Sequence, residues 1–173
     1  MQQYRPTNYV VFLRREKKMK SLYRMFAFGL AAGAFVVPSF AEERATAEEA
    51  VALVKKAVRY IKENGREKAF ADFNHPAGQF RDRDLYIFVL DFEGKVLAQG
   101  ANPRMVGKNI LDLRDVDGKY FVKSYLGIAR EKSHGWEEFK WLNPSNAAIE
   151  TKRAYVERYD DVVVGSGIYK AAK

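Results

Sequence analysis

The sequence has 173 residues, contains no cysteine and carries a formal net charge of +8. Residues 1–41 hold seven of the 30 Lys and Arg residues and one of the 22 acids, so the remaining chain has a net charge of only about +2. The basic excess therefore predicts no nucleic-acid partner. The lack of cysteine excludes disulfide bonds, so packing alone must stabilise the fold.

The N-terminal segment has the pattern of an export signal. Basic residues up to Arg24 precede an apolar run over residues 25–37. This run is shorter than the roughly 20 residues of a transmembrane helix, so we predict a signal peptide over residues 1–41 that is cleaved after Ala41, and a periplasmic or secreted protein. An uncleaved membrane anchor is the alternative. A true start near Met19 would give the signal a more usual length.

Residues 42–173 are predicted to form one domain, because a chain of this length can bury a substantial core. Thr46 and Glu49 form a capping-box pattern, which indicates the start of a helix. Apolar residues then recur at steps of three and four, which predicts one buried helix face. We expect this helix to end at Gly65 in a left-handed cap. A shorter helix is expected over residues 66–74.

The following segments predict an antiparallel sheet of about five strands. Residues 85–91 are rich in β-branched and aromatic residues, and Gly94 and a second strand over residues 96–99 follow, so a hairpin is expected. A third helix is expected over residues 120–131. Three more strands are predicted near residues 135–141, 149–158 and 162–169. The fold class is therefore α+β, with the long first helix on one face of the sheet.

A cation in the middle of a predicted strand is the best candidate for binding a ligand. Lys152 has apolar or aromatic neighbours, and charge-assisted hydrogen bonds to a carboxylate are strong in a partly dehydrated place. On a regular strand Lys152 and Tyr155 point to opposite faces, so both line one pocket only if a bulge intervenes. Arg153 shares the face of Tyr155 and is the rival cation. A solvated lysine on an outer face is the alternative interpretation of Lys152.

Aromatic residues of three predicted strands are the other candidates for a ligand pocket. Trp136, Phe139 and Trp141 are expected to wall the pocket, and Tyr86 and Phe88 share a strand face that would close its far side. Plain core packing is the alternative for each of these rings. We find no nucleophile, acid–base pair, cofactor loop or metal-ligand spacing, so no catalytic, cofactor or metal site is predicted.

The order of short motifs resembles the single Cache domain family over most of residues 42–173. The matching motifs, in chain order, are Tyr86 to Asp91, Gly94, Leu97-Ala98, Asn102-Pro103, Val106-Gly107-Lys108-Asn109, Asp117-Gly118-Lys119, Gly135-Trp136, Asn143-Pro144, Lys152, Tyr155-Val156 and Val164-Gly165-Ser166-Gly167-Ile168-Tyr169. The resemblance implies an extracytoplasmic sensor with a PAS-like sheet and a long N-terminal helix, binding small organic acids in signal transduction or chemotaxis.

The chain departs from the family pattern at two positions that bear on the ligand. Gln99-Gly100 stands where the family often has His-Pro, so an imidazole contact is absent. Phe139 stands where the family often has Tyr, so a hydroxyl donor is absent. These departures leave the identity of the ligand open.

The resemblance also implies a partner. The sequence stops at Lys173, four residues beyond Tyr169, so we expect a stand-alone domain that acts through a membrane receptor or kinase. The alternative is an interaction protein that forms a homodimer through its N-terminal helix and binds no small ligand.

Overall fold

The computed structural model describes residues 44–170, so the predicted signal peptide and its cleavage point lie outside the described residues. Helix α1 (Ala47–Asn64) begins with the predicted capping box. Glu49 N donates to Thr46 Oγ1 at 3.2 Å, and Thr46 N donates to Glu49 Oε2 at 2.8 Å. These two bonds satisfy backbone donors that the first turn of a helix leaves without partners.

The junction between the first two helices differs from the prediction. Gly65 has φ of 78° and ψ of 163°, which is extended rather than left-handed helical, so the predicted left-handed cap is wrong in form. Only glycine adopts this backbone conformation readily. Its N–H still donates to the carbonyl of Ile61 at 2.9 Å, and α2 (Arg66–Phe73) follows at once.

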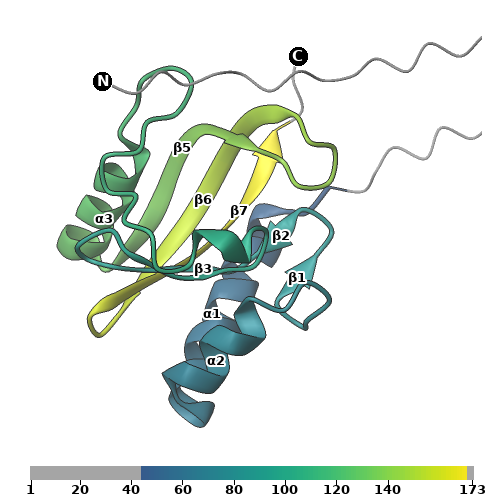
Figure 1. Ribbon diagram of the computed structural model, residues 1–173, viewed down its shortest axis with the longest axis vertical. Helices are drawn as coiled ribbons and strands as arrows, with labels where there is room; N and C mark the ends of the chain where they lie inside the picture. The colour runs from purple at the N-terminus through teal and green to yellow at the C-terminus, as the bar shows by residue number, and fades with distance from the viewer. Residues whose placement is uncertain (1–43, 171–173) are drawn as a thin grey trace, which may run out of the picture. The chain divides into compact units, whose positions relative to one another are not determined.

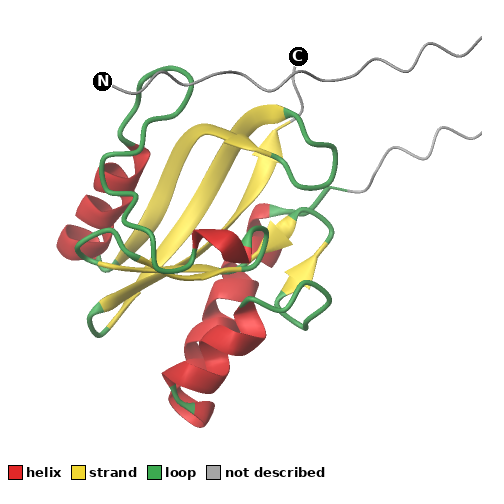
Figure 2. Ribbon diagram, in the orientation of Figure 1, coloured by secondary structure: helices red, strands yellow, loops and turns green. Residues whose placement is uncertain are grey.

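The main sheet has five antiparallel strands in the order β4-β3-β7-β6-β5. The hairpin and the three C-terminal strands are confirmed, and Figure 2 shows the three long strands side by side. The strands are β3 (Phe88–Asp91), β4 (Val96–Gln99), β5 (His134–Leu142), β6 (Ile149–Tyr159) and β7 (Val162–Lys170). The α+β, PAS-like fold class is therefore confirmed.

The strand predicted over residues 85–91 is divided in two. Its first part, β2 (Leu85–Tyr86), pairs with β1 (Arg81–Asp82) in a separate two-stranded sheet, and its second part is β3 of the main sheet. Ile87 lies between them, and its carbonyl accepts the N–H of Gly100 at 2.9 Å. Before Ile87 the chain pairs with β1, and after it the chain pairs with β4 and β7. This change of pairing depends on the tertiary fold and not on the local sequence.

The two faces of the main sheet carry different helices (Figure 1). Helix α1 packs against β6 and β7, and its buried residues Val54 and Ile61 meet Val89 and Val164 of the sheet. Helix α3 (Phe121–Lys132) packs against β5 and β6 on the other face. We call these the α1 face and the α3 face. Within residues 44–170 no helix is long and apolar enough to span a membrane.

The apolar stripe of α1 is covered by the sheet of its own chain. Its buried residues are Ala50, Val54, Ala57, Val58 and Ile61. Homodimer formation through this helix therefore stays a prediction and would have to use residues beside the stripe.

Candidate ligand-binding site

A pocket on the α3 face lies between the main sheet, α3 and the loop that follows β4. Five of the eight residues predicted for a ligand site line it, namely Tyr86, Phe88, Phe139, Trp141 and Lys152. The remaining lining residues are Leu90, Val96, Gln99, Met105, Ile110, Phe121 and Tyr125. The strands supply the floor and α3 supplies one wall.

Regular strand pairing explains why these residues meet. Lys152 on β6 is paired with Phe139 on β5 and with Tyr169 on β7, and residues opposite each other in a ladder share a face. Trp141 lies two residues beyond Phe139 and therefore points the same way. The ladders of β6 show no register shift on either side.

Lys152 is the central polar group of the pocket. The residue is 1% exposed, and its Nζ lies 3.8 Å from the ring centroid of Tyr86, 5.0 Å from that of Tyr169 and 5.6 Å from that of Phe88. Within residues 44–170 this amine has no hydrogen-bond or ion-pair partner. Burial holds the pKa of Lys152 well below its ordinary value, although the charge of Asp84 opposes this shift.

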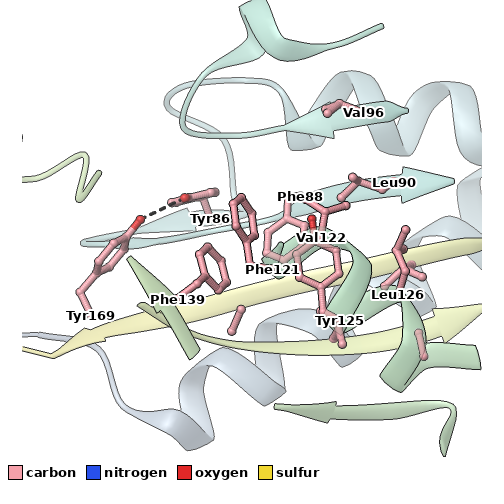
Figure 3. Packing of buried hydrophobic residues seen from close by; sticks show 14 residues of the cluster. Tyr86, Phe88, Leu90, Val96, Phe121, Val122, Tyr125, Leu126, Phe139 and Tyr169 are labelled. Atoms are coloured by element: carbon pink, nitrogen blue, oxygen red, sulfur yellow. Dashed lines mark hydrogen bonds between the residues drawn. The ribbon is translucent and has the colours of Figure 1, made fainter. Parts of the chain in front are cut away.

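Two tyrosine hydroxyls form a short chain beside Lys152. Tyr169 Oη donates to the carbonyl of Leu142 at 2.9 Å, so in the 3.0 Å contact between the two hydroxyls Tyr86 is the donor (Figure 3). Burial raises the pKa of Tyr86 to about 12. Both hydroxyls are therefore neutral at physiological pH, and Tyr86 Oη keeps lone pairs that can accept a further hydrogen bond.

Sequence reasoning missed two polar residues of the pocket. Tyr125 comes from α3, and the sequence of this helix gave no sign of a ligand site. Gln99 closes β4, and its Oε1 accepts the N–H of Ala101 at 3.4 Å. Gln99 lines the pocket, at the position where the family often has a histidine. The departure noted in the sequence was itself the signal for this residue.

Stacked rings form the apolar wall of the pocket. The rings of Phe121 and Phe139 are stacked, with centroids 4.2 Å apart and an angle of 9° between their planes. Trp141 meets Phe121 edge-on at 5.3 Å. Figure 3 shows Phe121 and Phe139 side by side on the same side of the sheet as Tyr125. Phe139 contributes a packing surface where a tyrosine would contribute a hydroxyl.

Two glycines of β7 make room for the pocket. A Cβ added to Gly165 would lie 2.2 Å from the ring of Phe88, and one added to Gly167 would lie 2.6 Å from the carbonyl of Arg153 and 3.0 Å from Cε of Lys152. Both glycines share the α3 face with Lys152, since Gly167 is paired with Ala154. The missing side chains let the ring of Phe88 and the stem of Lys152 lie close to the strand.

The other three predicted residues lie on the α1 face. Tyr155 and Trp136 are paired across β5 and β6, with ring centroids 5.3 Å apart, and the guanidinium of Arg153 lies 4.5 Å from the ring of Trp136. Trp136 and Arg153 line a separate groove with the first turns of α1. Because β6 has no bulge, these residues and Lys152 do not line one pocket.

The described residues contain no group of three or more acidic, histidine or cysteine side chains arranged to hold a metal ion. His134 lies near the ring of Tyr155, with centroids 6.0 Å apart. The groups that can donate to a ligand in the pocket are the amine of Lys152, the amide of Gln99 and the hydroxyl of Tyr125, which suit an anionic organic ligand better than a cation.

Comparison with known families agrees with this geometry. The family model described as "single Cache domain 2" matches residues 38–171, which is most of the chain. The chain belongs to the single Cache domain family. Cache domains are the extracytoplasmic sensory modules of chemotaxis receptors and histidine kinases, and they are sensory rather than catalytic.

The similar proteins are signalling receptors. The sensor histidine kinase MctS of Rhizobium johnstonii is 33% identical over 89 residues, which cover 50% of this chain and 19% of MctS. The methyl-accepting chemotaxis protein McpP of Pseudomonas putida is 26% identical over 90 residues, which cover 51% of this chain and 16% of McpP. The matching part of this chain thus corresponds to less than a fifth of either relative.

Solved structures show the same fold. A methyl-accepting chemotaxis protein from Vibrio parahaemolyticus is 26% identical with a TM-score of 0.63, over 70% of this chain and 86% of that one. A Cache chemosensory domain is 19% identical with a TM-score of 0.62, over 72% of this chain and 92% of that one. The family and fold expected from the sequence motifs are confirmed.

Proposed function

We propose that this Cache domain binds a small monocarboxylic acid in the pocket around Lys152. The observation that carries the proposal is a buried lysine without an acceptor in an aromatic pocket. A ligand carboxylate would provide the missing partner and form a charge-assisted hydrogen bond, which is shorter and stronger than a neutral one. Lys152 is also the only lysine or arginine among the lining residues that the structure describes, which favours one carboxylate over two.

Neutral donors would complete the recognition of the carboxylate. The NH2 group of Gln99 and the hydroxyl of Tyr125 line the same pocket as Lys152. The aromatic wall of Phe121 and Phe139 would pack against the rest of the ligand. This arrangement of a mostly apolar pocket with a few placed polar groups is usual for small-molecule sites.

A similar structure supports the ligand class without deciding it. The Cache chemosensory domain compared above is described as recognising carboxylic acid. At 19% identity the likeness concerns the fold. The proposal for this chain therefore rests on Lys152 and its surroundings.

The proposal includes a route for the signal. Because its relatives are a histidine kinase and a chemotaxis receptor, the domain would report ligand binding through a signalling protein of one of these classes. It would do so outside the cytoplasm, with residues 1–41 as the export signal and residues 42–173 as the sensor domain.

The test is ligand binding by the full-length chain and two matched variants. Lys152→Met keeps the length and apolar stem of the side chain and removes the amine, whereas Arg153→Met removes the neighbouring cation on the opposite face. Calorimetry with acetate, propionate, lactate and pyruvate should show binding that falls at least about tenfold in Lys152→Met, equivalent to about 1.4 kcal/mol. Arg153→Met should bind as the wild type does.

Three outcomes would contradict the proposal. Equal affinity of Lys152→Met and wild type would remove the amine from the site. A greater loss in Arg153→Met would move the site to the α1 face. No binding of any acid, together with a concentration-dependent dimer in sedimentation, would favour the interaction protein that forms through α1.

A further inference from the structure

A second cavity adjoins the pocket of Lys152. The pocket itself encloses about 20 Å³, and the second cavity encloses about 90 Å³. The two share three wall residues, Gln99, Met105 and Trp141. The second cavity is otherwise lined by Ala101, Asn102, Leu142 and Pro144, so it has no charged side chain in its wall.

The first cavity must enlarge to admit an organic acid. A volume of about 20 Å³ has room for little more than one water molecule, whereas even the smallest carboxylic acids have several heavy atoms. A wall residue must therefore move when an acid binds beside Lys152. The shape of the occupied pocket therefore depends on which lining residue moves at the lowest cost in free energy.

Most of the walls are held firmly. The stacked rings of Phe121 and Phe139 are each buried and contact further aromatic rings. The N–H of Ile110 donates to the carbonyl of Gly94 at 2.9 Å, and the N–H of Gly107 donates to that of Val96 at 2.8 Å, so residues 107–110 are tied to β4 and the turn before it.

Met105 is held less firmly than these residues. It ends the short 3-10 helix η1 (Pro103–Met105) and is partly exposed. The backbone hydrogen bonds of Met105 go to Asn102 and Lys108 of the same loop, at 3.0 and 3.1 Å. Its unbranched side chain has several rotatable bonds and adapts to irregular space at low cost.

We propose that Met105 separates a carboxylate subsite from a tail subsite, and that the occupied pocket accepts an unbranched aliphatic acid whose tail passes Met105 into the second cavity. This inference rests on the proposed function and adds the shape of the ligand to it. Movement of Met105 merges the two cavities, because it lies in the wall of both. The tail would then lie among Ala101, Leu142 and Pro144, which offer apolar contacts to methylene groups.

The experiment measures affinity along a series of acids by calorimetry on the full-length chain. The probes are acetate, propionate, butanoate, pentanoate and hexanoate. If the tail enters the second cavity, each added methylene beyond propionate should raise affinity by about threefold to fourfold until the cavity is full. Met105→Trp should block the passage and so lower the affinity for hexanoate at least about tenfold more than the affinity for acetate.

The matched control is Val106→Trp, because Val106 is 41% exposed, neighbours Met105 in the same loop and lines neither cavity. It should leave the whole series unchanged. Loss of affinity beyond propionate in the wild type, or equal chain-length profiles for Met105→Trp and wild type, would overturn the tail subsite while the carboxylate site stands. Failure of every acid to bind, or binding that ignores Lys152→Met, would overturn both proposals.

Discussion

The two faces of one sheet differ in what their side chains surround. On the α1 face, side chains of β3, β6 and β7 interlock with a helix and form a closed apolar core that includes Val89, Tyr155 and Val164. On the α3 face, alternate residues of the same strands pack with α3 in a second buried cluster that includes Leu90, Val156 and Val163, and Phe88 and Lys152 of this face also line a pocket. Both faces thus hold a buried core, and strand parity places the Lys152 pocket on the α3 face.

The contrast shows how a small domain can hold a buried amine. Because the core on the α1 face does not include Lys152, its packing does not depend on how the amine is accommodated. The α3 face can then contain two glycines, a buried amine and a loop wall, each of which is unfavourable in an ordinary core. Variants on the two faces should separate folding from binding.

The largest effect on stability is expected on the α1 face. Ile61→Ala removes a side chain that is 3% exposed and packed in the core, so unfolding should become easier by about 2–5 kcal/mol. The acid affinity of the molecules that remain folded should not change. Chemical denaturation and calorimetry of the same sample measure both quantities. A fall in affinity that exceeds the loss of folded protein would show that the faces are not separate.

Two neighbouring residues of β7 allow a smaller but sharper test. Gly165→Ala places a Cβ against the ring of Phe88 on the α3 face, so it should cost about 1–3 kcal/mol and weaken acid binding. Ser166→Ala removes a buried hydroxyl that has no hydrogen-bond partner on the α1 face, so it should be neutral or slightly stabilising. Thermal denaturation with and without ligand gives the comparison. Similar costs for both variants would contradict the assignment of faces.

The smallest expected effect is a gain in the stability of the unliganded protein. Lys152→Met should stabilise the unliganded protein at pH 7 by about 1 kcal/mol, because the buried amine is without a partner. The pKa of Lys152 is lower in the folded state than in the unfolded state. Below pH 10.5 the amine is therefore more fully protonated in the unfolded chain than in the folded chain. Wild-type stability therefore rises with pH relative to the variant, and the gain should shrink toward pH 10.5. Urea denaturation at pH 7 and pH 10 measures this, and a constant difference would show that Lys152 is charged in the folded state.

The features predicted correctly from the sequence are those with local causes. The first helix follows from the capping box at Thr46 and from apolar spacing, and both are visible within a few residues. The hairpin follows from Gly94, whose φ is 86° in the structure. The division of the strand at Ile87 was not predictable in this way, because it depends on which strand each half pairs with.

Local patterns likewise predicted only some of the residues around the pocket. Parity along β5 and β6 grouped Phe139 with Trp141 and separated Lys152 from Tyr155, and the structure shows both relations. Tyr125 and Met105 could not be found, because they reach the pocket from a helix and a loop whose positions only the tertiary fold determines. Nearness in sequence to Lys152 was a poor guide, since Arg153 lies on the other face.

The pairing of Arg44 has a consequence for how the domain can be joined to other chains. Arg44 donates to both oxygens of Glu150, at 2.8 and 2.9 Å, and to the carbonyl of Tyr169 at 3.3 Å. The first described residue thus contacts Tyr169, which is next to the last described residue. Domains with neighbouring ends tolerate circular permutation and insertion. This domain is accordingly suited to insertion into a host protein, where the pocket around Lys152 would be transferred as one unit.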